Sequence, residues 1–300
     1  MRIQSHEPAD DHAPHVDPVT GMMTTGHEWD GISELNTPLP KWWLYIFYAT
    51  IVWSLGYYVV YPSWPLAQSF TRGIWDWSSR GAVSADVQEL RNARKANNDK
   101  LAAMPIAEVL KNPTMLSFAQ AQGKAAFGDN CAPCHGAGGG GAVGYPNLTD
   151  DDWLWGGKPE QILETITVGV RSTDKDTRSG AMTAFGEGAS PILNKQQISD
   201  VADYVRSLSG LKDTPGAEKG KAVFAENCVA CHGEDAKGNQ DLGAPNLTDK
   251  IWLYGSDKAT IEYAVTHGRG GVMPTWKGRL DDATIKSLAV YVYTLGGGQK

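Results

Sequence analysis

The carboxy-terminal two thirds of the chain repeat themselves, and the repeat contains every cysteine. The segment GKAAFGDNCAPCHG, which begins at Gly123, returns as GKAVFAENCVACHG at Gly220. PNLTDDDWLWGG at Pro146 returns in the same order as PNLTDKIWLYGS at Pro245. Self-similarity of this kind indicates two copies of one structural unit, so the sequence predicts duplicated modules.

Each copy ends in a helical pattern, QQISDVADYVRSLSG in the first and ATIKSLAVYVYTLGG in the second. Apolar residues recur there at the spacing of one helix face. The fold class that we expect is therefore mainly α. The predicted division is a polar tail at 1–40, a transmembrane anchor at 41–62, a connection with a spacer helix at 63–115, and two modules at 116–212 and 213–300.

The stretch from Trp42 to Tyr61 carries no charged residue. At about 1.5 Å per residue, its roughly 20 residues match the hydrocarbon core of a bilayer. Trp and Tyr crowd both ends, as they do at membrane interfaces. We predict an uncleaved membrane anchor, because a buried core helix seldom runs this long without a polar face. A signal peptide is disfavoured, since an acidic segment precedes the stretch and no small-residue cleavage site follows it.

The segments on either side of the anchor lack an apolar period. Residues 1–40 mix acidic residues with prolines and read as a flexible polar tail. The spacing of the four histidines in this tail matches no metal-ligand template, so we expect them to be solvated: His6, His12, His15 and His27. Beyond the anchor, residues 63–83 predict an irregular connection, and the charged segment from Ser84 to Met104 predicts an exposed helix with Ser84 as its N-cap.

The formal net charge of the chain is −7. Phosphate binding needs clustered Lys and Arg, so this balance argues against a nucleic-acid partner. It is compatible with a basic protein partner.

Cys-x-x-Cys-His is the attachment signature of a covalent c-type haem, in which two thiols bond the vinyl groups and the histidine coordinates the iron. The cysteines expected to hold two haem c groups are Cys131, Cys134, Cys228 and Cys231, and the proximal ligands are His135 and His232. A structural zinc site is the first alternative, but paired zinc motifs lie closer together than Cys134 and Cys228 do. A redox dithiol is the second, but it would not need the histidine twice.

Methionine is the expected sixth iron ligand. Met182 is the only methionine between the two motifs, and Met273 is the only one after the second. Both lie in Gly-rich loops before the closing helix, so we expect each to serve the haem of its own copy. His267 is a rival ligand for the second haem, but its counterpart in the first copy is Gly169.

The matched surroundings of the two motifs supply further candidates. The proximal imidazole needs an acceptor for its second N–H, which the backbone carbonyls of Pro146 and Pro245 can provide. Arg171 and Arg269 are candidate partners of the haem propionates, with ordinary surface arginines as the equal alternative. The aromatic residues expected to wall the haem pockets, or simply to pack the core, are Trp153, Trp155, Trp252 and Tyr254.

His/Met ligation raises the potential of haem iron and fills both axial positions. The haems are then expected to transfer electrons and not to bind oxygen or peroxide; a dihaem peroxidase, the rival enzyme class, needs an open distal position. Covalent haem attachment takes place outside the bacterial inner membrane. We therefore expect a cytoplasmic amino terminus and periplasmic haem modules.

Each module resembles class I cytochrome c, in which the closing helix crosses the opening helix. Upstream, GHEWDGISELNTPLPKWW, the span and YPSWPL resemble the amino-terminal hallmark of the dihaem subunit (subunit III, the CcoP family) of cbb3-type cytochrome c oxidases. The resemblance covers residues 26–300. It differs in that this chain has a single span, and the first Met loop, RSTDKDTRSGAM, is longer than the second.

The resemblance implies a function and partners. The family's subunit passes electrons from a soluble periplasmic cytochrome c toward a haem–copper catalytic subunit, beside a monohaem cytochrome subunit, and has no catalytic site of its own. The same residues would serve two alternatives, the cytochrome subunit of a membrane dehydrogenase or a free-standing anchored electron shuttle.

Overall fold

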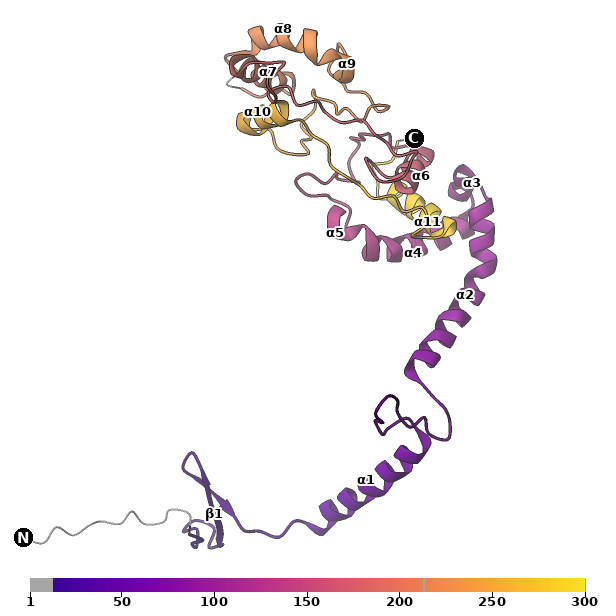
Figure 1. Ribbon diagram of the computed structural model, residues 1–300, viewed down its shortest axis with the longest axis vertical. Coiled ribbons are helices and arrows are strands. Elements are labelled where there is room, and N and C mark those ends of the chain that lie inside the picture. Colours follow the sequence, from indigo (N-terminus) through magenta and orange to yellow (C-terminus); the bar gives the residue numbers. More distant parts are fainter. Residues whose placement is uncertain (1–12, 213, 300) are drawn as a thin grey trace, which may run out of the picture. The chain divides into compact units, whose positions relative to one another are not determined.

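The computed structural model describes residues 13–212 and 214–299. The chain forms two compact units, one ending at Leu90 and the other beginning at Arg91. The described residues are mainly helical, as the sequence predicts (Figure 1).

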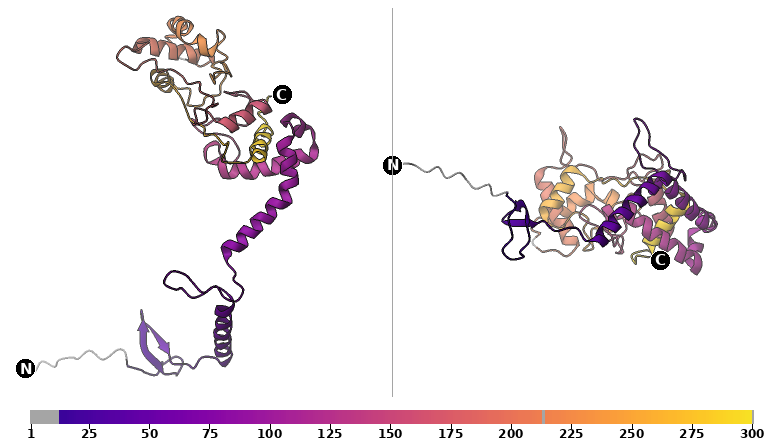
Figure 2. Two further views of the ribbon diagram at one scale, coloured as in Figure 1. Left: turned by 45° about the vertical axis from the view of Figure 1, so that its right-hand side comes forward. Right: turned by 90° about the horizontal axis from the view of Figure 1, so that it is seen from below.

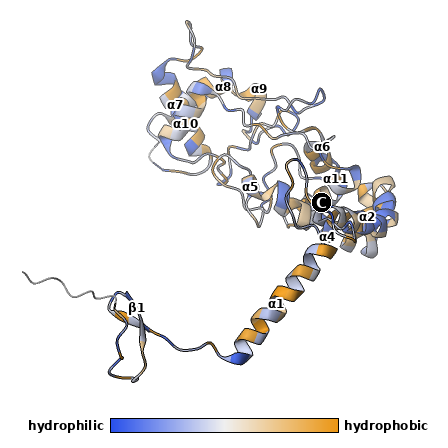
Figure 3. Ribbon diagram, turned by 60° about the horizontal axis from the view of Figure 1, so that its bottom comes forward, coloured by the Kyte–Doolittle hydropathy of each residue, from blue (hydrophilic) through white to orange (hydrophobic). Residues whose placement is uncertain are grey.

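The anchor helix α1 (Lys41–Val60) lies in the first unit and buries none of its residues there. Among the described residues it is the one helix long and apolar enough to cross a membrane, and Figure 3 shows hydrophobic bands along its length and a hydrophilic end. Two of its carboxy-terminal carbonyls are satisfied by the returning chain, since the N–H groups of Ile74 and Trp75 donate to Val59 and Val60 at 3.1 and 3.3 Å. The helix expected from the uncharged stretch is confirmed.

A β-hairpin lies in the segment predicted to be a flexible tail. Strands β1 (Thr24–Trp29) and β2 (Ile32–Leu35) pair antiparallel. Asp30 and Gly31 between them have positive φ angles of 51° and 84°, which suits the tight turns that Asp-Gly favours in hairpins. The prediction of an unstructured segment is wrong for these residues. His15 bonds Thr24 beside the hairpin, while His6 and His12, which we also expect to be solvated, lie outside the described residues.

The spacer helix α2 (Ser79–Ala103) starts earlier than Ser84, the N-cap that the sequence suggested. The hydroxyl of Ser78 accepts a hydrogen bond from the N–H of Gly81 at 3.0 Å and so takes the capping role. Three carbonyls at the end of α2 and just beyond it, those of Leu101, Ala102 and Met104, accept hydrogen bonds from the ammonium group of Lys286.

The second unit contains two hydrophobic cores, each under its own set of helices. The first body consists of α3 (Ile106–Lys111), α4 (Pro113–Asn130), α5 (Ala132–His135), α6 (Pro159–Val168) and α11 (Asp282–Tyr293). The second body consists of α7 (Lys195–Leu208), α8 (Ala217–Asn227), α9 (Val229–His232) and α10 (Lys258–His267). Leu101 and Val109 are fully buried in the first core, so this body begins before residue 116, where the repeat suggested a boundary.

The closing helices of the two copies are exchanged. We expected α7 to cross α4 and α11 to cross α8, but α11 packs on α4 and α7 packs on α8 (Figures 1 and 2). Both crossings are built alike: a Cβ at Gly123 would collide with the Ser287 carbonyl of α11. A Cβ at Gly220 would collide in the same way with the Asp200 carbonyl of α7.

The short connection between α7 and α8 explains the exchange. Residues 209–216 connect the two helices, a length typical of helices that pack as neighbours. A local pairing of this kind closes a shorter loop, and therefore loses less chain entropy, than a pairing of α7 with the distant α4. Helix α11 then packs on α4. It can do so because α4 and α8 present the same packing surface of glycine and phenylalanine.

Two extended segments carry the chain from one body to the other and back. They contact each other through the backbone bridge between Met182 and Arg269, and Met273 of the second segment also bridges to Val170, just after α6. We call residues 178–182 the outward segment and residues 269–273 the return segment. The first body is therefore built from the beginning and the end of the second unit. The second body is built from one continuous stretch of chain between the two segments.

Candidate functional site

The first Cys-x-x-Cys-His motif forms one helical turn directly after α4. The N–H of Cys131 donates to Phe127 at 2.8 Å and that of His135 donates to Cys131 at 2.9 Å, so α5 continues the helical bonding. Cys131 is half-buried against the first core, whereas Cys134 is exposed. One thiol therefore faces the body and the other faces its surface.

The imidazole of His135 is held by the Gly-rich loop that follows it. Its Nδ1 lies 2.9 Å from the carbonyl oxygen of Pro146, so Nδ1–H donates and Nε2 keeps its lone pair. Burial lowers the pKa of His135, and the hydrogen bond to Pro146 opposes this only in part. The ring is therefore neutral at physiological pH, which is the form that coordinates a metal.

The second motif has the same geometry. Nδ1 of His232 lies 3.1 Å from the carbonyl oxygen of Pro245, and burial likewise lowers the pKa of His232. Burial also raises the pKa of the inner thiols, Cys131 and Cys228, to about 11 in each case. The thiol that faces each body is consequently protonated before any bond to it forms.

Matched glycines bring each proline carbonyl to its histidine. The N–H of Gly141 donates to the His135 carbonyl, and that of Gly238 donates to the His232 carbonyl, both at 2.8 Å. Both glycines have positive φ angles, 71° and 81°. A Cβ at either position would collide with backbone around the proline, so this loop shape requires glycine.

The candidate methionines follow the exchange of the closing helices. Met273 packs against the first core, which also receives Cys131, whereas Met182 packs against the second core with Cys228. Backbone contacts agree: the N–H of Val170, just after α6, donates to Met273 at 2.9 Å. We expect from the sequence that each methionine serves the haem of its own copy, but the packing supports the opposite pairing. Each Met loop carries the chain into the other body before the closing helix begins.

Among the candidate arginines, Arg171 is turned to the backbone. Its Nε donates to the Gly271 carbonyl at 2.6 Å and its Nη1 donates to the Gly180 carbonyl. Sequence matching paired Arg171 with Arg269, but the guanidinium group placed like that of Arg269 belongs to Arg178. Arg178 opens RSGAM as Arg269 opens RGGVM, and the two guanidinium groups lie over the matched rings of Trp155 and Tyr254. The sequence signal that could have identified Arg178 is the number of residues between arginine and methionine, which is the same in RSGAM and RGGVM.

The four candidate aromatic residues divide between the cores and the boundary of the two bodies. Trp153 packs on the first core and donates from Nε1 to the Gly297 carbonyl at 2.6 Å, and Trp252 packs on the second core. Trp155 instead approaches Gly243 of the second motif's loop, and Tyr254 approaches Gly144 of the first. These two residues therefore pack one body against the other.

The rival ligand His267 has another partner. Its Nδ1 contacts the carboxylate of Glu187, and its ring lies 4.3 Å from that of Tyr263. His267 is exposed at the end of α10, so nothing directs it toward the second motif.

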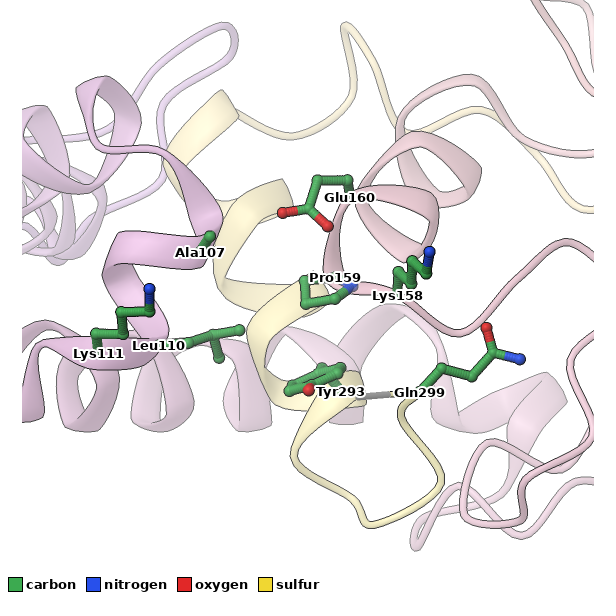
Figure 4. Close-up of a pocket in the computed structure, with 8 residues that line it drawn as sticks. All are labelled: Ala107, Leu110, Lys111, Lys158, Pro159, Glu160, Tyr293 and Gln299. Carbon is green, nitrogen blue, oxygen red and sulfur yellow. The ribbon is translucent and has the colours of Figure 1, made fainter.

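A surface pocket of about 390 Å³ opens on the first body where α3, α6 and α11 meet (Figure 4). Its lining includes Lys111, Lys158, Glu160, Tyr293 and Gln299. No cysteine, histidine or methionine lines it, so it is separate from the two motifs.

The residues around the motifs fit haem c. Each body offers two thiols, a neutral imidazole and a thioether, the donor set of a covalent six-coordinate haem. In each body a buried guanidinium Nε, that of Arg178 or of Arg269, also lacks a hydrogen-bond partner among the described residues. Such an atom suits an anionic group, and haem carries carboxylates.

Comparison with known proteins agrees along the chain. Three family models match: the N-terminal domain of cytochrome oxidase-cbb3, FixP, at residues 21–68, cytochrome c at 120–209, and cytochrome C oxidase, cbb3-type, subunit III, at 215–292. A cbb3-type cytochrome c oxidase subunit FixP of Azorhizobium caulinodans is 60% identical over 98% of this chain and 99% of its own. The chain belongs to the FixP/CcoP family of cbb3-type oxidase subunits.

Further members of this family are similarly close. FixP of Bradyrhizobium diazoefficiens is 57% identical over 96% of this chain and 99% of its own. CcoP of Azospirillum brasilense is 53% identical over 94% of this chain and 98% of its own. Membership confirms two tandem cytochrome c modules behind an anchor helix, with haem c as cofactor, and it favours the oxidase subunit over a dehydrogenase subunit or a free shuttle.

Proposed function

We propose that this chain is the dihaem electron-transfer subunit of a cbb3-type oxidase and that it relays electrons without a catalytic site of its own. The observation that carries the proposal is the repeated histidine geometry: in both bodies a neutral imidazole donates from Nδ1 to a proline carbonyl and leaves Nε2 for a metal. Haem c supplies the one-electron iron couple when it is bound.

We assign the ligands by body and not by sequence copy. The first haem is attached at Cys131 and Cys134, with His135 and Met273 as axial ligands. The second haem is attached at Cys228 and Cys231, with His232 and Met182 as axial ligands. The support is that Cys131 and Met273 pack on the first hydrophobic core, while Cys228 and Met182 pack on the second.

A closed His/Met pair is what separates a relay from an oxygen-binding or peroxide-binding haem. Both methionines are only partly buried and pack on the apolar core of their body, where a thioether needs no hydrogen-bond partner. With these methionines as ligands, both axial positions of each haem would be filled, and the iron would offer no site to a small substrate.

The topology and the partners complete the proposal. We place the amino terminus and the hairpin in the cytoplasm and both bodies in the periplasm, because covalent haem attachment occurs there. The electron donor is a soluble periplasmic cytochrome c, and the acceptors are the monohaem and haem–copper subunits of the oxidase. The acidic net charge of −7 supports a basic donor.

Purification of the complex in mild detergent tests this function. We expect the chain to co-purify with haem–copper partners, to stain for two covalent haems and to show a sulfur–iron charge-transfer band from both oxidised haems. A chain that leaves the membrane without a haem–copper partner would overturn the oxidase assignment. A band from only one haem would favour a peroxidase-type site at the other.

A further inference from the structure

The outward and return segments each begin with an arginine and end with a methionine. Arg178 and Met182 bound the outward segment, and Arg269 and Met273 bound the return segment. The two ends of each segment belong to different bodies. Each arginine is therefore assigned to a body separately from the methionine of the same segment.

Arg178 belongs to the first body. Its Nη2 donates to the carboxylate of Glu164 at 2.9 Å and approaches the Gln161 carbonyl at 3.3 Å, both on α6. The guanidinium carbon lies 5.4 Å from the ring centre of Trp155. The side chain is 13% exposed, and Nε is buried without a hydrogen-bond partner among the described residues.

Arg269 belongs to the second body. Its guanidinium carbon lies 4.1 Å from the ring centre of Tyr254 and 4.9 Å from that of Tyr263 on α10. Its Nε is likewise buried and unpartnered in the part of the chain that the structure describes. No carboxylate forms an ion pair with Arg269 there, in contrast to Arg178 and Glu164.

The stacked rings leave the edge of each guanidinium to bind an anion. Cation–π contact holds the planar group against an aromatic face, and its N–H groups then point along the plane, in the fork that matches a carboxylate. A buried N–H without an acceptor is costly. No described carboxylate accepts from either Nε, and haem would bring its own propionates into each body.

We infer that Arg178 binds a propionate of the first haem and Arg269 a propionate of the second, so that each crossing segment gives a cation to one haem and an axial ligand to the other. The inference rests on the proposed function. Arg178 and Arg269 are positioning residues in this role, since they act on the iron through the propionate and do not touch it.

The charges of Arg178 and Glu164 predict that replacing the two residues shifts the potential of the first haem in opposite directions. Loss of the Arg178 cation leaves the propionate charge uncompensated, favours ferric iron and lowers the potential of the first haem. Glu164 offsets that cation, so Glu164→Gln should raise the same potential. Arg269 has no such counter-charge, so Arg269→Gln should lower the potential of the second haem by more than Arg178→Gln lowers that of the first.

Potentiometric titration of the purified complex tests the inference, in a Met273→His background that separates the two redox waves. Arg178→Gln and Glu164→Gln are expected to move only the displaced wave, in opposite directions, and Arg269→Gln only the other. Arg279→Gln is the matched control, because this exposed arginine also lies over a ring, that of Trp276 at 5.9 Å. It should move neither wave.

The outcomes separate this inference from the proposed function. Haem staining and the sulfur charge-transfer band are recorded first on the unsubstituted complex, and their absence there overturns the proposed function. With both present, unchanged waves in Arg178→Gln and Arg269→Gln, or shifts equal to those of Arg279→Gln, overturn the arginine assignment. Where Arg178→Gln prevents haem incorporation, Glu164→Gln decides: a raised potential supports the assignment and an unchanged or lowered one refutes it.

Discussion

The two bodies share one helix crossing but stabilise it differently. In the first, the seam position Val290 of α11 is apolar and fully buried. In the second, the equivalent position on α7 is Asp203, which is 1% exposed. Its carboxylate accepts from Lys258 on α10 at 2.8 Å and from the N–H of Gly216 at 3.0 Å. One fold thus tolerates either an apolar contact or a buried ion pair at the same place.

The bodies also differ in how the chain closes them. The second body is continuous from the Met182 loop through α10, whereas the first needs α4 from one end of the unit and α11 from the other. The first body therefore depends on the last residues of the chain, although its haem motif comes first. Each prediction below separates the two bodies.

Truncation after Gly270 should have the largest effect. It removes Met273 and α11, so the first haem loses its sixth ligand and its body loses half of the helix crossing. We expect the second haem to keep its sulfur charge-transfer band, and the first to lose it or to be absent from a haem-stained gel. Loss confined to the second haem would contradict the exchanged arrangement.

Lys258→Met should destabilise the second body by about 3 kcal/mol, because it leaves the buried Asp203 carboxylate with only the more distant Arg206, at 4.0 Å, as a cation. Adding Asp203→Val, which copies Val290 of the first body, should restore most of the loss. Denaturant unfolding monitored at the second haem measures both. If Lys258→Met alone were as stable as the parent protein, the ion pair would not be buried as described.

Gly238→Ala should cost about 1–3 kcal/mol, because the φ angle of 81° is unfavourable for alanine and the Cβ would press on backbone at Pro245. Displacing that carbonyl removes the acceptor that makes the His232 ring a stronger donor to iron, so the second haem should also show a raised potential. Gly140→Ala in the first loop is the control, since a Cβ there meets nothing. Equal effects of the two substitutions would argue against the carbonyl–histidine geometry.

Asp152 gives the smallest effect, and its sign depends on pH. Burial and then the charge of Asp249 raise the pKa of Asp152 from 3.8 to about 6. Stability from the protonated form is therefore full below about pH 4 and is lost as pH rises through about 6. Asp152→Asn, which removes a charge where the second copy has Ile251, should stabilise the protein above pH 7 by about 1 kcal/mol after allowance for solvent screening.

Thermal unfolding across this pH range measures the effect, with Asp151→Asn as the neighbouring control. The gain should disappear below about pH 4, where Asp152 is protonated in both states. A gain independent of pH would show that the carboxylate does not titrate in this range.

The chemistry of each haem motif could be predicted from the sequence, while the choice of which helices pack together could not. The Cys-x-x-Cys-His spacing and the proline positions follow from bonding within one loop. The exchange does not, because Gly123 and Gly220 offer the same seam to Tyr291 and Tyr204, so this glycine–tyrosine contact does not distinguish the two pairings. The length of the connection after α7 favours one of them.

Two further differences have local causes. The residues inserted before RSGAM shifted the apparent match of Arg269 from Arg178 to Arg171. The hairpin was missed because its strands are short, although Asp30-Gly31 between them is a hairpin turn signal.

The pairing of ligands across the sequence copies is tested most directly in chains that keep one haem. In the Cys228→Ala/Cys231→Ala chain only the first haem is attached, and Met273→His or Met182→His is then added. The account predicts that Met273→His abolishes the sulfur charge-transfer band and lowers the potential, while Met182→His leaves both nearly unchanged. The reverse result, with Met182→His removing the band, would contradict it.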